Sequence, residues 1–204
     1  MNFPSSLIKN TVEAISNFPG IGKKTTLRLA IYLLRNKQYA HNIADAIKEM
    51  VDNTKYCINC NNISKDKLCD ICNNMKRNKH TICIVEDIRD VIAIENTMQY
   101  NGHYHVLGGL ISPIDGIGPN ELNIHNLIEK ISTQKIEEII FALCANMEGE
   151  TTSYYIYKKI KPFNINTTTI SKGISIGNEL EYTDQITLGR ALLNRYSFDK
   201  TLKQ

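Results

Sequence analysis

Apolar side chains recur at helical spacing through residues 1–54, and this spacing predicts three helices. The first covers about residues 5–16, with Ser5 or Ser6 as its cap. The second follows Gly22, and one of its faces carries Leu27, Ala30, Ile31 and Leu34. The third spans about His41–Thr54, and the side chains expected to face inward are Ile43, Ile47, Met50 or Val51, and Thr54.

From Thr81 onward the pattern changes to short apolar runs separated by helical periods. The runs predict strands at Ile82–Val85, Tyr104–Leu107, Ile139–Leu143 and, more weakly, Asn166–Ile170. Helices are expected after Asp87, at about Glu121–Ser132 and after Glu148. Alternating strands and helices predict an α/β unit with a parallel sheet, whose functional groups lie at the carboxyl ends of strands.

The segment between these two parts is polar and has little material for a core of its own. Its apolar residues are few, namely Ile58, Ile63, Leu68 and Ile71. Such a segment needs a metal or a covalent staple to stay folded.

Two CxxC pairs supply that staple: Cys57 with Cys60, and Cys69 with Cys72. Four thiolates at this spacing fit one tetrahedral ion, and zinc is the expected metal, one structural Zn²⁺ per chain. Two disulfides are the alternative, but nothing in the sequence indicates secretion. The remaining cysteines, Cys83 and Cys144, lie in apolar runs and are expected to be buried thiols.

The amino-acid composition says little about which molecules this protein binds. The chain has 204 residues and a formal net charge of +3, which permits nucleic-acid binding without requiring it. The N-terminus lacks the pattern of a signal peptide, and no apolar run is long enough to cross a membrane. We therefore expect a cytoplasmic protein that does not bind membranes.

Between the first two predicted helices lies a short glycine hairpin, Phe18–Pro19–Gly20–Ile21–Gly22. Gly20 and Gly22 leave the backbone N–H groups of the next helix open to a phosphate, and Gly22 is expected to allow the sharp turn. Lys24 and Arg28 are four residues apart and project from the same side, next to Lys23. The hairpin is therefore a candidate DNA-binding site, although a tight turn between two core helices gives the same pattern. A phosphate-binding P-loop fits poorly, because its first glycine would fall at Asn17.

Acidic residues follow two of the predicted strands, with Glu86 after the first and Glu148 and Glu150 after the third. This arrangement resembles the Toprim fold of topoisomerases, primases and some nucleases. Those enzymes pair one Glu with a later Asp-x-Asp, but Cys144 and Asn146 stand at the Asp-x-Asp positions here. Two-metal catalysis needs several anionic oxygens, so we interpret this as a degenerate, non-catalytic Toprim domain. Glu148 and Glu150 then serve as favourable charge in the first turn of a helix, or as partner contacts.

Taken together, the hairpin, the CxxC pairs, the acidic strand ends and the tail resemble the RecR family of bacterial recombination mediators. The resemblance also rests on Leu110–Ser112–Pro113, Asp115–Pro119 and the tail Gly173–Asp184. Departures from the family pattern are Lys23 for a usual Pro, and Ser175 and Asn178 in the tail.

The resemblance implies a protein with no catalytic activity that binds DNA without sequence preference. It also implies self-assembly into dimers or tetrameric rings, and work with RecO or RecF in loading the RecA recombinase at single-strand gaps. The expected modules are a helix-hairpin-helix at 1–54, a zinc finger at 55–78, the Toprim domain at 79–176 and an assembly tail at 177–204. The zinc finger is expected to act as a structural clip between its neighbours.

Three alternatives stay open at this point. A Mg²⁺-dependent Toprim nuclease or primase that uses Glu86 is the competing function. The tail helix, expected at about Asp184–Tyr196, docks within its own subunit or exchanges with a neighbour. The Gly/Pro-rich loop at 108–119 is either a surface loop or a partner-binding loop.

Overall fold

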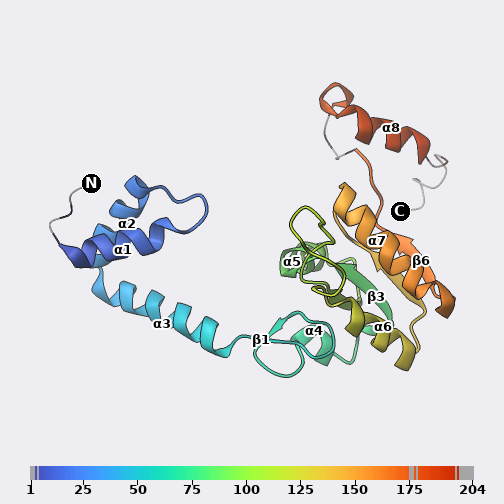
Figure 1. Cartoon of the computed structure of the whole chain (residues 1–204), viewed down its shortest axis with the longest axis horizontal. Coiled ribbons are helices and arrows are strands. Elements are labelled where there is room, and N and C mark those ends of the chain that lie inside the picture. Colours follow the sequence, from blue (N-terminus) through green and yellow to red (C-terminus); the bar gives the residue numbers. More distant parts are fainter. Residues whose placement is uncertain (1–2, 4, 175–176, 178, 196, 198–204) are drawn as a thin grey trace. The chain divides into compact units, whose positions relative to one another are not determined.

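The computed structural model describes residues 3, 5–174, 177, 179–195 and 197, and it contains two compact units (Figure 1). The first comprises residues 1–54 and the second residues 55–204. The predicted combination of a helix-hairpin-helix, a four-cysteine motif, a parallel α/β sheet and a helical tail is confirmed. Within the described part of the chain, no helix combines the length and apolar character that a membrane span requires.

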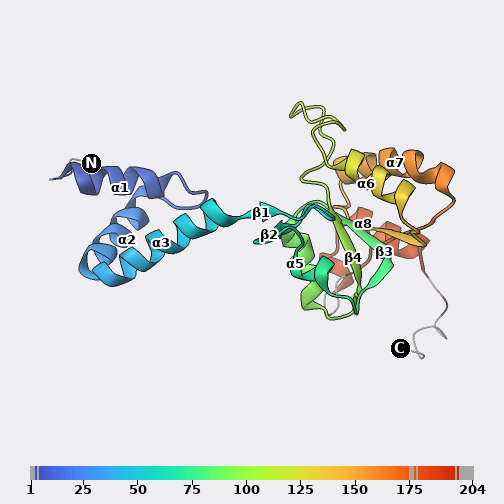
Figure 2. The same ribbon diagram turned by 90° about the horizontal axis from the view of Figure 1, so that it is seen from below.

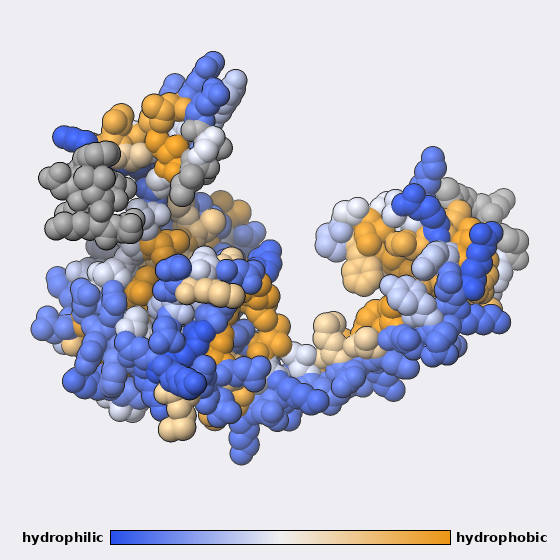
Figure 3. Space-filling view, turned by 180° about the vertical axis from the view of Figure 1, so that it is seen from behind, coloured by the Kyte–Doolittle hydropathy of each residue, from blue (hydrophilic) through white to orange (hydrophobic). Residues whose placement is uncertain are grey.

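The N-terminal unit contains α1 (Ser6–Ser16), α2 (Lys23–Arg35) and α3 (Lys37–Asn53). Ser5 caps α1 by accepting a hydrogen bond from the Leu7 N–H. Among the described residues, packing of α1 against α2 buries only Val12, Thr26 and Ala30, which is a very small core. Apolar side chains consequently come to the surface of this unit, as Figure 3 shows in orange.

The prediction that one face of α3 packs inward is wrong for the single chain. Helix α3 buries none of its residues, and Ile47, Met50 and Val51 are 50%, 61% and 68% exposed. On α2, Ile31 and Leu34 are also exposed. The sequence pattern identified the apolar faces of α2 and α3, but packing within this unit buries only Ala30 of the α2 face and leaves most of the α3 face exposed.

The C-terminal unit begins with the cysteine segment. Two short antiparallel strands, β1 (Lys55–Tyr56) and β2 (Ile63–Ser64), are followed by the single turn α4 (Asp70–Asn73). The apolar residues expected to form a small core are mostly exposed, with Ile58 at 74%. The four cysteines are the core instead, and Ile71 packs against them.

A four-stranded parallel sheet forms the body of this unit, in the order β4-β3-β5-β6. Its strands are β3 (Asn78–Val85), β4 (Gly102–Val106), β5 (Glu138–Phe141) and β6 (Asn166–Thr169). Helices α6 (Ile124–Thr133) and α7 (Met147–Ile160) cover one face, and α5 (Ile88–Asn96) covers the other (Figure 2).

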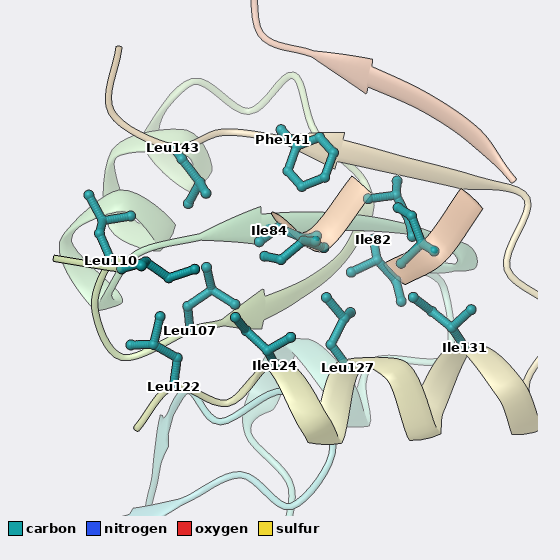
Figure 4. Packing of buried hydrophobic residues seen from close by; sticks show 14 of the residues in the cluster. Ile82, Ile84, Leu107, Leu110, Leu122, Ile124, Leu127, Ile131, Phe141 and Leu143 are labelled. Atoms are coloured by element: carbon teal, nitrogen blue, oxygen red, sulfur yellow. The ribbon is translucent and has the colours of Figure 1, made fainter. Parts of the chain in front are cut away.

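The Ile82–Val85 part of strand β3 is buried on both faces, as its continuous apolar run predicts, whereas Asn78, Lys79 and His80 are exposed. Ile82 and Ile84 point toward α6, where Leu127 and Ile131 meet them (Figure 4). Cys83 and Val85 point to the opposite face and pack in the cluster that contains α5 residues. Packing on both faces therefore fixes the position of β3 up to Val85, and with it the point at which Glu86 leaves the sheet.

The loop before α6 is longer than the sequence predicted. Helix α6 starts at Ile124 rather than Glu121, because the preceding loop stays non-helical and folds back through a bridge between Ser112 and Ile117. The chain also carries short 3-10 turns, η1 (Lys161–Phe163) and η2 (Leu180–Tyr182), and then α8 (Gln185–Leu193). Ser175, Asn178 and Tyr196 lie outside the described residues.

Candidate functional site

The four CxxC sulfurs form one cluster. Their Sγ atoms all lie within 4.8 Å of one another, and the Cys60 and Cys69 sulfurs are 3.6 Å apart. Tetrahedral coordination with metal–sulfur bonds near ~2.3 Å places sulfurs about 3.8 Å apart. All four side chains are buried, so the cluster fits a structural site with no open position for substrate.

Local hydrogen bonds fix these thiols in place. The Asn61 N–H donates to the Cys57 carbonyl, and Asn61 itself takes a left-handed conformation with φ of 59°. The Asn59 side-chain amide donates to Cys72 Sγ over 3.2 Å. Hydrogen bonds with Cys60 and Cys72 lower the pKa of Cys69, whereas the bond with Cys69 raises the pKa of Cys60. Four thiols this close cannot all lose their protons unless a cation compensates the negative charge of the thiolates. A bound metal ion would supply that positive charge.

A buried lysine supports the cysteine turn from α6. Lys130 is only 7% exposed, and its Nζ donates to the Asn59 carbonyl over 3.3 Å. Burial lowers the pKa of Lys130, while the four cysteines act in the opposite direction. This contact was missed from the sequence because it joins residues 71 positions apart.

The hairpin of the N-terminal unit has one glycine in the left-handed region, and it is Gly20 rather than Gly22. Gly20 has a φ of +79°, and the Ile21 N–H closes the turn onto the Phe18 carbonyl. Gly22 is extended, with φ of −81°, and serves as the N-cap of α2 without a side chain to occupy the helix end. The first N–H groups of α2 therefore have no side-chain cap.

Basic side chains surround this helix start. Lys23, Lys24 and Arg28 are all exposed, and α2 has no acidic residue in its first turn. Arg35, which was not predicted from the sequence, lines the same surface hollow as Lys24 and Arg28. Its position seven residues after Arg28 was the available signal.

At the carboxyl edge of the sheet, Glu86 follows β3 and lines a cavity of about 640 Å³ with Asp90 and Cys144. Burial, together with the charges of Asp90 and Asp87, raises the pKa of Glu86. Cys144 is exposed there, which corrects the expectation of a buried thiol. Cys83, by contrast, is buried as predicted.

Glu148 and Glu150 lie in the first turn of α7 and are engaged by other groups. Glu148 accepts a hydrogen bond of 2.8 Å from the Ser112 hydroxyl. Glu150 pairs with Lys172 at 3.1 Å and with Arg190 of α8 at 2.8 Å. Asn146 caps α7 by accepting from the Gly149 N–H over 2.8 Å. Glu148, Glu150 and Asn146 therefore each have a structural role within the chain.

Three protein-family models match successive parts of this chain. The family model described as "RecR, helix-hairpin-helix" matches residues 8–51, the Toprim domain model matches residues 80–171, and "RecR, C-terminal" matches residues 173–196. The chain is 55% identical over 204 residues to a recombination protein RecR of Flavobacterium johnsoniae, covering 100% of this chain and 99% of that one.

Other relatives agree over the full length. Recombination proteins RecR of Flavobacterium psychrophilum and Cytophaga hutchinsonii are each 51% identical, over 204 and 201 residues. Those alignments cover 100% and 98% of this chain, and 99% and 98% of the two relatives. With the hairpin, the four-cysteine cluster and the parallel sheet in the matching order, the chain belongs to the RecR family of recombination proteins.

Proposed function

We propose that this protein is a non-enzymatic, DNA-binding recombination mediator. It works with RecO-type or RecF-type partners, or both, and helps to load the RecA recombinase at single-strand gaps. The observation that carries the proposal is the start of α2, which is uncapped and basic, in a chain of the RecR family.

The DNA site in this proposal consists of Gly20, Gly22, Lys23, Lys24 and Arg28. An uncapped helix start attracts phosphate through its free N–H groups and its positive end. The basic side chains add charge that does not read base sequence. No ion pair among the described residues uses Lys23, Lys24 or Arg28, so their charge is available to a ligand.

The residues that follow strands β3 and β5 support the proposal that the protein is not an enzyme. Cys144 and Asn146 replace two carboxylates, and Asn146 is occupied as a helix cap. Glu150 is held by two cations of its own chain. The acidic residues that line the cavity are Glu86, Asp90 and Asp184. Asp184 caps α8 and Asp90 belongs to the capping box of α5, which leaves too few free oxygens for a two-metal centre. Glu86 remains available as a partner contact, whereas Glu148 and Glu150 would first have to release Ser112, Lys172 and Arg190.

We propose zinc as the ion of Cys57, Cys60, Cys69 and Cys72, because four thiolates in a closed site suit it best. The metal would supply structural cohesion and no chemistry. No disulfide joins any of the six cysteines, which agrees with the proposed location in the reducing cytoplasm.

Self-assembly into a dimer or a tetrameric ring is the proposed state. The apolar surface of α3, formed by Ile47, Met50 and Val51, supports it, since such a surface marks an interaction site. We propose the module boundaries 1–54, 55–78, 79–176 and 177–204, with the last serving assembly.

The decisive experiment measures binding of the full-length chain to labelled single-stranded and duplex DNA at several salt concentrations. The double variant Lys24→Ala/Arg28→Ala should bind both forms more weakly, with the slope of log affinity against log salt reduced by roughly two. The control Lys37→Ala/Lys48→Ala removes equal charge from α3 and should change little. Unchanged DNA affinity in the Lys24/Arg28 variant would exclude the hairpin as the site.

The competing function has its own test. Cleavage or primer synthesis that requires Mg²⁺ and disappears in Glu86→Gln would establish a Toprim enzyme and overturn the mediator proposal as stated.

A further inference from the structure

One face of α2 combines cations with an exposed aromatic ring. A surface hollow of about 550 Å³ runs along this helix, and its lining includes Lys24, Arg28, Tyr32 and Arg35, together with Leu27 and Ile31. None of the described residues that line it is acidic. The face continues well beyond the helix start that the hairpin presents.

The three cations form one row. At 100° per residue, Lys24, Arg28 and Arg35 fall within about 40° of one another around the helix axis. Along the axis they are separated by about 6 Å and about 10 Å. No described ion pair involves any of them. A row of this kind follows several phosphates of one strand rather than a single anion.

Tyr32 lies beside this row and is held in place. Its ring packs edge to face against Tyr39 of α3, with centroids 6.1 Å apart and planes at 83°. Its carbonyl accepts a hydrogen bond of 2.8 Å from the Asn36 side chain, which secures the end of α2. Each tyrosine is nevertheless 53% exposed, so a further aromatic ring has room to stack.

We propose that this face of α2 is a site for single-stranded DNA, in which Tyr32 stacks on an unpaired base while Lys24, Arg28 and Arg35 hold the phosphates. A duplex keeps the faces of its bases covered, whereas an unpaired base offers one to an aromatic side chain. The inference rests on the proposed DNA-binding function and deepens it, by naming the strand state that the site prefers and two further residues, Tyr32 and Arg35.

A second copy of the chain is the competing occupant, because Leu27, Ile31 and Tyr32 are apolar. Charge argues against it. A symmetric contact brings the same patch of both subunits together, so the cationic rows would face each other without acidic residues between them. Single-stranded DNA supplies the opposite charge along the whole row.

The experiment uses the full-length chain and an oligo(dT) strand that carries one 2-aminopurine, whose fluorescence reports stacking. The same sequence as a duplex serves as the second ligand. Tyr32→Leu keeps apolar bulk but removes the ring. It should weaken single-strand affinity about fivefold or more and abolish the stacking signal, with duplex affinity unchanged. Tyr32→Phe should behave as wild type, and Arg35→Gln should reduce the salt slope by about one.

Tyr157→Leu is the matched control. Tyr157 is an exposed tyrosine on α7, adjacent to Lys158, but Glu150 lines the hollow beside it. Its loss should leave single-strand binding unchanged. The proposal is overturned if Tyr32→Leu binds single strands as wild type does, if it loses single-strand and duplex affinity equally, or if Tyr157→Leu loses as much. Wild-type binding by Arg35→Gln also overturns it.

Two further readouts separate the alternatives. A lower assembly mass in Tyr32→Leu, with single-strand affinity retained, would assign the face to a second copy and overturn the proposal. If Lys24→Ala/Arg28→Ala is impaired while Tyr32→Leu is not, only the stacking site fails. If the double variant binds DNA normally, the proposed DNA function itself fails.

Discussion

The backbone N–H of Val106, at the end of β4, donates a hydrogen bond of 2.8 Å to the carbonyl oxygen of Cys60. It joins the first CxxC turn to the sheet, and the bond from Lys130 to Asn59 joins the same turn to α6. The cysteine segment is therefore part of the α/β unit rather than an independent finger.

Loss of one cysteine should destabilise this unit as a whole. Cys69→Ser is expected to abolish binding of the proposed metal and to lower the Tm by about 5 °C or more, since the cysteines form the core of their segment. Calorimetry with metal analysis measures both effects. Cys144→Ser, an exposed cysteine outside the cluster, should retain the metal and the Tm. A wild-type chain that is metal-free yet equally stable would contradict this prediction.

Two glycines should respond in opposite directions to alanine. A Cβ at Gly149 would overlap the Cys144 carbonyl oxygen and lie 2.9 Å from the Cys144 carbonyl carbon, so Gly149→Ala should cost about 1–3 kcal/mol. Gly189 lies within α8, and a Cβ added there would meet no described atom within 4 Å, so Gly189→Ala should gain up to about 1 kcal/mol. Urea unfolding measures both; equal effects would refute the packing argument.

The buried His105 should make stability depend on pH. Burial lowers its pKa to about 4 from an ordinary 6.5, while its Nε2 hydrogen-bonds the Asn123 carbonyl at 2.8 Å. The unfolded chain binds a proton first as pH falls, so stability is full above about pH 6.5 and declines toward about pH 4. Between pH 7 and pH 5 this group should cost about 2 kcal/mol.

Urea unfolding of wild type and His105→Gln at both pH values tests the histidine. Cysteine protonation and metal loss affect both proteins, so the difference between them isolates His105. The exposed His41→Gln should keep the wild-type pH dependence. If His105→Gln loses as much stability as wild type between the two pH values, the histidine is not responsible.

Charge placed on the bare face of α3 should disrupt assembly without unfolding the helix. Ile47→Lys/Val51→Lys is expected to lower the mass measured by sedimentation, because both side chains are half or more exposed in the single chain. Asp45→Lys/Glu49→Lys adds positive charge to the opposite face and should leave the mass unchanged. An unaltered mass in the first variant would assign assembly to another surface.

Much of the fold was predictable from the sequence, because local patterns specify local structure. The run Ile82–Val85 predicted a strand buried on both faces, and it lies in the centre of the sheet. The order of strands was not predictable, since pairing of β3 with both β4 and β5 depends on contacts across many residues. The inward face of α3 was wrong because periodicity reports an apolar face but not what covers it.

Some residues of the candidate sites were predictable from the sequence, and others were not. Cysteine spacing was enough to predict the four-sulfur cluster, because the ligands are close in sequence. Lys130 could not be identified, since only the folded sheet brings α6 to the cysteine turn. In the hairpin, the sequence indicated two glycines, and only the backbone angles distinguish Gly20, which has a positive φ, from Gly22, which caps α2.

Strand β4 is one of the two outer strands of the sheet, and the Cys60 carbonyl accepts a hydrogen bond from the N–H of its last residue, Val106. Exposed strand edges recruit strands from other chains. Losing the metal would therefore do more than lower a melting temperature: it would uncover a template for edge-to-edge aggregation. Metal supply would then govern how much of this protein stays dispersed.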